Sequence, residues 1–249
     1  MNPLSIALVF AHPDDETFMM GATVRKLTEL GHNVSLYTAT SGDAGKFGRL
    51  PLTSRDQLAA KRRKELQNAC HILGVKSLVI GPFADKGLSG LGHGVLQDAV
   101  ADFLRTVNAQ IVFTFPADGF SGHPDHTAIS AAVFAAVPDT PCVRKLYVGA
   151  SPVITQTHMV TTVIDVAPQR QAKLDALLAH ETQVFSVERV YPDLSSRKTD
   201  CLSSTESFVL AWHDGIWWPS VSPVETDLHE GSLQQNEIPG QTTWVRFVH

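Results

Sequence analysis

The chain has 249 residues, of which 43% are apolar and 18% are charged, and its net charge at pH 7 is −5. This balance is that of a globular protein with enough apolar material for a full core. Because no basic patch stands out, we expect no nucleic-acid partner. No run reaches the roughly 20 apolar residues of a membrane span, and no signal-peptide pattern opens the chain. We therefore expect a cytoplasmic protein that does not bind membranes.

Apolar patterns predict that strands and helices alternate over the first 150 residues. The strands are apolar runs that end at turn residues, and the helices carry apolar residues at helical spacing. Strands are expected at 5–11, 33–40, 77–80, 110–115 and 145–148, and helices at 18–30, 54–73, 95–107 and 127–137. Such alternation is typical of an α/β protein with a mostly parallel, Rossmann-like sheet and helices on both faces.

The pattern becomes less regular after residue 150. Strands are expected at 160–166 and 208–212, a helix at 168–180, and a short strand at 243–248. We find no internal repeat and no clean linker, so we expect one domain over residues 1–249 with an elaborated C-terminal portion. Within it, residues 214–249 form an extension that we leave unassigned. The three cysteines are far apart and form no CxxC pair, which argues against a disulfide framework or a thiolate zinc site.

A dense polar cluster follows the first strand directly. The segment 12–16 reads His-Pro-Asp-Asp-Glu, at the strand end where ligands bind in open α/β sheets. One aspartate would be enough to cap the next helix. However, two adjacent carboxylates beside a histidine repel one another and are costly to desolvate. The segment therefore favours a site over a simple cap.

A second polar cluster, His123-Pro124-Asp125-His126, follows the strand expected at 110–115. The carboxyl ends of central strands lie side by side in a doubly wound sheet, so the two clusters are expected to face each other. Two imidazoles and one carboxylate with an open position describe a catalytic zinc site. Ferrous iron fits the same ligand types. A single histidine is more often an ordinary hydrogen-bonded residue, but this combination of residues favours a metal site.

These two motifs together resemble the LmbE/PIG-L family of zinc-dependent N-acetylglucosamine de-N-acetylases. Weaker similarities run through residues 5–183. Residues 40–45, Thr-Ser-Gly-Asp-Ala-Gly, are similar to a family loop that has Glu where this chain has Asp43. The helix after residue 54 contains the Arg-x-x-Glu pair that starts at Arg62. Residues 180–183, His-Glu-Thr-Gln, are similar to the family's His-x-Ser-Gln element.

The resemblance implies that His12, Asp15 and His126 bind zinc and that Asp14 is the general base. The chemistry of amide hydrolysis fits this division, because a carboxylate free of the metal can take a proton from the attacking water. We expect His123 to stabilise the oxyanion or to protonate the leaving amine. Asp125 is the expected partner that orients an imidazole.

The expected partner is a small N-acetylated sugar, and the sequence leaves a homo-oligomer open. The resemblance implies that Arg62 binds this substrate. Asp43 either hydrogen-bonds sugar hydroxyls or is an ordinary turn residue beside Gly42. His180 is a weaker site residue on the same resemblance. The Trp217–Trp218 pair fits aromatic packing better than a sugar-stacking rim.

Other functions are compatible with parts of this pattern. A metallophosphoesterase usually needs a second metal and more ligands than the sequence offers. A ferrous oxygenase would share the ligand set, but the free carboxylate beside it fits hydrolysis better. A carbohydrate- or metabolite-binding protein with a relict metal site would be expected to have lost at least one of these residues. The sequence does not identify which N-acetyl sugar conjugate is the substrate.

Overall fold

The computed structural model describes residues 3–92, 94–192, 194–196, 198–221, 224–226 and 228. Strands and helices alternate along the first 150 residues, as the apolar pattern predicts. The elements are β1 (Ser5–Phe10), α1 (Asp15–Glu29), β2 (Asn33–Thr40), α2 (Arg55–Leu73), β3 (Ser77–Phe83), α3 (Val95–Thr106), β4 (Ile111–Thr114), α4 (Pro124–Ala136), β5 (Lys145–Gly149), β6 (Thr162–Asp165), α5 (Arg170–Ala179), α6 (Val184–Val190), β7 (Thr205–His213) and β8 (Ile216–Trp217).

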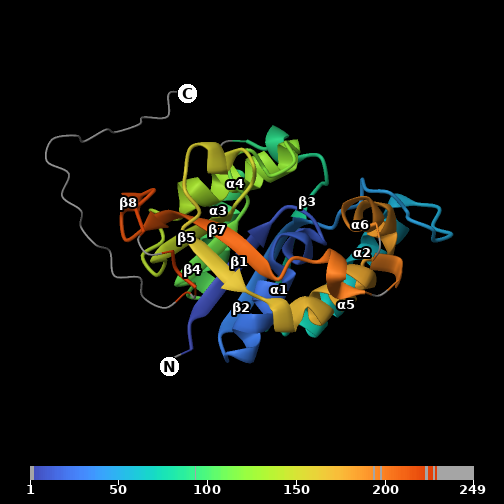
Figure 1. The fold of residues 1–249 in the computed structure, drawn as a ribbon. Helices are drawn as coiled ribbons and strands as arrows, with labels where there is room; N and C mark the ends of the chain where they lie inside the picture. The colour runs from blue at the N-terminus through green and yellow to red at the C-terminus, as the bar shows by residue number, and fades with distance from the viewer. Residues whose placement is uncertain are drawn as a thin grey trace, which may run out of the picture.

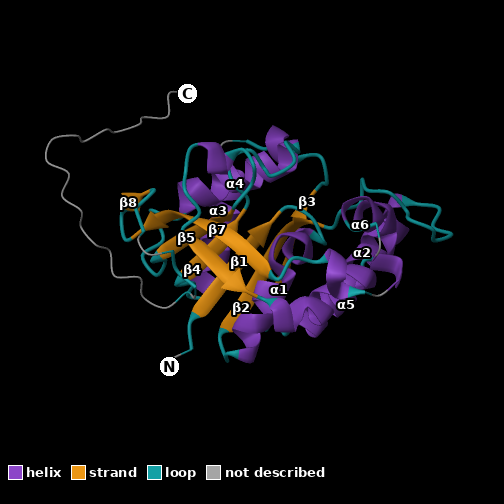
Figure 2. Ribbon diagram, viewed as in Figure 1, coloured by secondary structure: helices purple, strands orange, loops and turns teal. Residues whose placement is uncertain are grey.

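One mixed sheet forms the centre of the protein, with strand order β3-β2-β1-β4-β5-β7-β6 (Figure 2). The first five strands are parallel, and β1 lies between β2 and β4, so that Leu8 pairs with both Leu36 and Phe113. β7 runs antiparallel to β5, β6 and β8. The central strand is buried on both faces because its side chains are continuously apolar.

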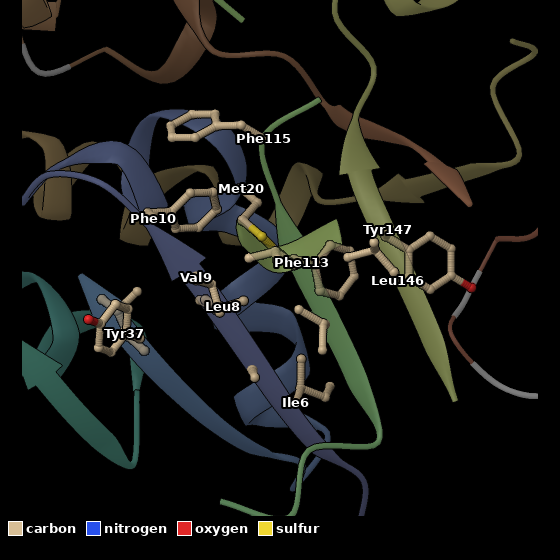
Figure 3. Close-up of a cluster of buried hydrophobic side chains, with 14 of the residues drawn as sticks. Ile6, Leu8, Val9, Phe10, Met20, Tyr37, Phe113, Phe115, Leu146 and Tyr147 are labelled. Atoms are coloured by element: carbon tan, nitrogen blue, oxygen red, sulfur yellow. The ribbon is translucent and has the colours of Figure 1, made fainter. Parts of the chain in front are cut away.

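Helices cover the sheet on both sides. α1, α2 and α5 pack against one another on one side, and α3 packs against α4 on the other (Figure 1). Large side chains such as Phe10, Phe113 and Tyr147 fill the space around the strands (Figure 3). No helix within the described part of the chain is both long enough and apolar enough to cross a bilayer.

The C-terminal half differs from the local expectations in two ways. β7 is longer than the predicted strand at 208–212, and it inserts between β5 and β6. α6 and β8 were not predicted at all, because a two-turn helix and a two-residue strand leave almost no periodic signal. The predicted strand at 243–248 lies outside the described residues.

The sheet order fixes where the two polar clusters lie. β1 and β4 are hydrogen-bonded neighbours, and both lead into loops at the same edge of the sheet. α4 begins at Pro124, three residues earlier than its apolar pattern suggests. Asp125 and His126 therefore belong to the first turn of a helix that begins beside the end of β1.

Candidate metal centre and active site

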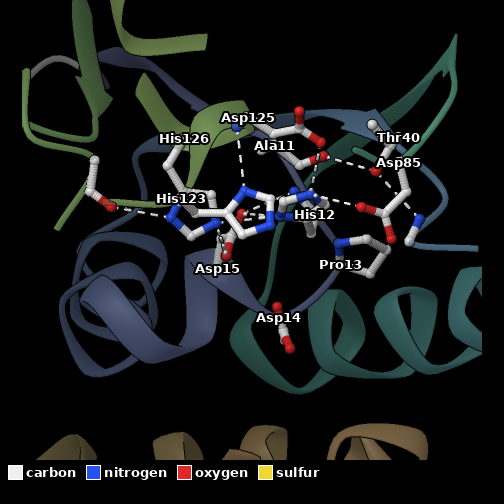
Figure 4. Close-up of polar contacts among 12 residues, drawn as sticks. Ala11, His12, Pro13, Asp14, Asp15, Thr40, Asp85, His123, Asp125 and His126 are labelled. Carbon is white, nitrogen blue, oxygen red and sulfur yellow. Dashed lines mark hydrogen bonds and ion pairs between the residues drawn. The ribbon is translucent and has the colours of Figure 1, made fainter. Parts of the chain in front are cut away.

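Three predicted metal ligands converge at the carboxyl ends of β1 and β4 (Figure 4). His12 Nδ1 lies 3.1 Å from His126 Nε2 and 3.6 Å from Asp15 Oδ2. His126 Nε2 is 3.4 Å from Asp15 Oδ1. The three side chains come from the β1–α1 loop, the first turn of α1 and the first turn of α4. They form a small triangle of one carboxylate and two imidazole nitrogens.

The far side of each imidazole is tied to an oxygen acceptor. His12 Nε2 lies 3.1 Å from Asp85 Oδ1 and 3.2 Å from Asp125 Oδ2. His126 Nδ1 lies 3.0 Å from the Gly119 carbonyl oxygen. With the hydrogens on those nitrogens, His12 Nδ1 and His126 Nε2 turn their lone pairs toward each other and toward Asp15.

This arrangement fits a bound divalent metal. Two facing lone pairs and a carboxylate repel one another unless a cation lies between them. Zinc bonds of about 2.0–2.1 Å in tetrahedral geometry place neighbouring ligand atoms roughly 3.3–3.4 Å apart. The imidazole nitrogens are 3.1 Å apart, and each lies within 3.6 Å of a different Asp15 oxygen. His12, Asp15 and His126 therefore offer donor types that suit zinc, although one Asp15 oxygen does not make both contacts.

The electrostatics of the centre also favour positive charge. Burial acts against a charged His12, but hydrogen bonds with Asp125, Asp15 and Asp85 outweigh it and raise the pKa of His12 to about 12. Burial likewise opposes ionisation of Asp15, yet the imidazoles of His126 and His12 lower its pKa to about 2. The site thus holds an ionised carboxylate and attracts a cation, whether a proton or a metal ion.

Ligand-type atoms within the described residues also gather in two other groups that share His12. One adds His123 to His12 and His126, and the other joins His12 to Asp85 and Asp125. Asp85 follows β3 and was not predicted as a site residue. The sequence could have indicated Asp85 only because an acidic residue follows a third parallel strand. This indication is weak on its own.

Asp14 has an unusual backbone conformation. It precedes α1 with φ 115° and ψ −25°, a left-handed region that is costly for a residue with a Cβ. Its side chain makes no capping hydrogen bond, so the simple helix-cap interpretation is wrong. Its backbone N–H donates to Glu16 Oε2 at 3.2 Å. The carboxylate lies apart from the imidazoles in Figure 4 and is 3.4 Å from Arg62 Nη2.

The surroundings of Asp14 tune its proton affinity. Burial raises the pKa of Asp14 to about 7, with Asp15 and Glu16 adding to the rise and Arg62 opposing it. A carboxyl group that titrates near neutrality can exchange protons at physiological pH. This property suits a general acid–base group, and it depends on burial next to other carboxylates.

His123 is the N-cap of α4. Its Nδ1 accepts a hydrogen bond from the Asp125 backbone N–H at 3.1 Å, which leaves the ring hydrogen on Nε2. The ring centroid lies 4.9 Å from those of His12 and His126. Burial lowers the pKa of His123, and the neighbouring imidazoles lower it further. A neutral ring with an Nε2 hydrogen is a hydrogen-bond donor.

Arg62 reaches the site from α2, and its guanidinium is buried. Nη1 donates to the Gly42 carbonyl at 3.0 Å, and Nη2 donates to the Pro13 carbonyl next to Asp14. Only 3% of Arg62 is exposed. The guanidinium therefore contacts the loops that follow β1 and β2. The role of Arg62 in substrate binding stays a prediction.

Asp43 and His180 lie farther from the three ligands. The side chain of half-buried Asp43 is 3.4 Å from the Asp85 backbone N–H, which couples it to the loop after β3. His180, at the end of α5, is buried, and its Nε2 lies 3.4 Å from Glu16 Oε1. His180 thus contacts the residue that holds the Asp14 backbone. Neither arrangement tests the predicted roles.

Comparison with known proteins places this chain in a family. A model described as PIG-L: GlcNAc-PI de-N-acetylase matches residues 7–137, a range that contains both polar clusters. A probable N-acetyl-alpha-D-glucosaminyl L-malate deacetylase 2 of Bacillus cereus is 32% identical over 184 residues, covering 72% of this chain and 83% of that protein.

Solved structures share the fold at lower identity. The N,N'-diacetylchitobiose deacetylase of Pyrococcus horikoshii has a TM-score of 0.66 and 22% identity, covering 82% of each chain. A 4-carboxy-2-hydroxymuconate hydratase of Pseudomonas putida has a TM-score of 0.60 and 18% identity, covering 84% of this chain and 97% of that one. The fold alone therefore does not select the reaction. Because the family model matches more than half of its length, however, this chain belongs to the PIG-L family.

Proposed function

We propose that this protein is a metal-dependent hydrolase that removes the acetyl group from an N-acetylglucosamine-type sugar or conjugate. The observation that carries the proposal is the triangle of His12, Asp15 and His126, with the buried carboxylate of Asp14 on the residue that precedes Asp15. The deacetylases among the similar proteins support the reaction.

His12, Asp15 and His126 would hold the metal, which we propose to be zinc, with Fe2+ as the alternative. When bound, such an ion polarises an amide carbonyl and makes water more acidic. Asp85 and Asp125 keep the His12 ring turned toward the metal position by accepting its Nε2 hydrogen. The Gly119 carbonyl does the same for His126.

Asp14 is the proposed general base. It takes a proton from the water that attacks the acetyl carbonyl carbon, and it returns that proton to the nitrogen as the C–N bond breaks. The products are acetate and the free amine. The hydrogen bond accepted by His123 Nδ1 leaves a hydrogen on Nε2, and we propose that Nε2–H donates to the carbonyl oxygen as negative charge develops there.

The proposed substrate is a GlcNAc conjugate. The family model and the two deacetylases are named for different groups attached to this sugar, namely phosphatidylinositol, malate and a second sugar. The part that these substrates share is N-acetylated glucosamine, so we propose that the substrate of this protein contains it. We assign Arg62 and Asp43 to substrate binding, in line with their contacts to the loops after β2 and β3.

The direct test is acetate release by protein loaded with one equivalent of Zn2+ or Fe2+. A panel of N-acetylglucosaminides with malate, inositol and glucosamine as attached groups would be assayed with wild type and His126→Ala. We expect metal-dependent acetate release from at least one of them and little from the variant. Absence of acetate release from every N-acetyl sugar, in protein with full metal occupancy, would overturn the proposed function.

A further inference from the structure

Phe120 is an exposed aromatic residue in a strained position beside the metal ligands. It has φ 64°, a left-handed conformation in which a bulky side chain is an outlier. It is also 45% exposed. The preceding residue, Gly119, supplies the carbonyl that fixes the His126 ring. The backbone is therefore strained at a residue that exposes a phenyl ring and directly follows the contact of Gly119 with His126.

The ring packs at the end of β5, on the sheet edge that also carries the proposed metal ligands. A Cβ on Gly149, at the end of β5, would lie 2.9 Å from Phe120 Cε2 and 3.0 Å from Met19 Sδ. The ring edge thus rests against the bare backbone of Gly149 and close to Met19. Met19 follows Asp15 by four residues on α1, so their side chains share one face of the helix.

The chemistry of the surroundings indicates what the exposed ring contacts. The groups around the metal position are imidazoles and carboxylates, which bind polar atoms. A pyranose also has an apolar face of C–H groups, and a flat aromatic ring is the usual surface for such a face. Single exposed apolar residues are common and need no explanation. Phe120 differs from them because it combines a positive φ, a glycine that admits its ring, and a position in the loop that leads into α4.

We propose that Phe120 is a substrate-binding residue whose ring stacks on the apolar face of the N-acetylated sugar. With the acetamido group at the ligands, the attached pyranose would lie next to the loop between β4 and α4, which carries Phe120. Gly149 and Met19 support the ring from behind. This inference rests on the proposed function, and it adds to it a requirement for a pyranose ring next to the scissile amide.

The first experiment compares Phe120→Ala and Phe120→Trp with wild type on the best N-acetylglucosaminide of the panel. Loss of the ring should raise KM about tenfold, because the stacking contact with the sugar is lost. The value of kcat should change much less, and the tryptophan variant should keep KM near that of wild type. Leu30→Ala, which removes an exposed leucine at the far end of α1, is the control and should leave KM unchanged.

Two further variants separate binding from a structural role. Gly149→Ala keeps the phenyl ring but displaces it, so it should raise KM as Phe120→Ala does. Phe120→Gly removes the ring and relieves the positive φ, so it should raise KM without lowering Tm. An active wild type together with a Phe120→Ala KM within twofold of it would overturn the inference. An inactive wild type would instead count against the proposed function.

Discussion

His12 Nδ1 and His126 Nε2 lie 3.1 Å apart, although 114 positions separate the two residues in the chain. Each imidazole is fixed from behind, by Asp85 and Asp125 for His12 and by the Gly119 carbonyl for His126. The two ring nitrogens proposed to bind the metal therefore already face each other in the protein without metal. Such preorganisation lowers the cost of assembling the site and makes its integrity dependent on both loops.

The first prediction concerns metal content. His126→Ala removes one of three ligands, so the variant should lose most of the metal that wild type carries at close to one equivalent per chain. Elemental analysis of both proteins, purified without chelator, measures this directly. Full occupancy in His126→Ala would show that His126 is not a ligand.

Asp14→Asn should separate catalysis from metal binding. The amide keeps the size of the side chain but cannot accept a proton, so kcat should fall by about 10²–10⁴. Zinc content should stay near that of wild type, because Asp14 points away from the three ligands (Figure 4). Steady-state kinetics and elemental analysis on the same preparation check both parts. Loss of metal would instead make Asp14 a ligand.

Because the backbone at Asp14 is strained, we expect a glycine variant at this position to be more stable than an alanine variant. Asp14→Gly and Asp14→Ala both remove the carboxylate, but only glycine tolerates φ 115° without a Cβ clash. We expect the glycine variant to have a free energy of unfolding about 1–2 kcal/mol larger than the alanine variant. At ordinary positions alanine is the more stable of the two. Urea unfolding of the metal-free proteins gives the comparison, and the ordinary order would argue against strain at this residue.

Arg62→Ala tests the role of the buried guanidinium. If Arg62 binds substrate, its loss should raise KM by about 10- to 100-fold, as expected for hydrogen bonds to a charged group worth about 1.5–3 kcal/mol, with a smaller effect on kcat. Arg62 also contacts the Pro13 carbonyl and the Asp14 carboxylate, so its loss could instead affect the position of Asp14. An unchanged KM with a collapsed kcat would make Arg62 a residue that positions Asp14. Arg63→Ala, one residue away on α2 and exposed, is the matched control.

Much of the fold follows from local sequence patterns. The apolar runs that become β1, β2 and β4 are continuous because these strands are buried on both faces. α2 begins at its Ser54 cap and ends at Gly74, as its sequence predicts. The antiparallel insertion of β7 between β5 and β6 could not be predicted, because pairing between distant strands leaves no periodic signal in either of them.

For the candidate site, too, some features follow from the sequence and others only from the tertiary structure. The sequence by itself determined which residue types meet at the sheet edge, since two polar motifs follow two strands that a parallel sheet brings together. Only the tertiary structure decided the contacts among side chains from separate loops: Asp85 against His12, the burial of Arg62 beside Asp14, and Phe120 over Gly149. Those contacts depend on strand order and on loop conformations such as the positive φ of Asp14 and Phe120. Local propensity specifies neither, because both arise from interactions between residues far apart in the chain.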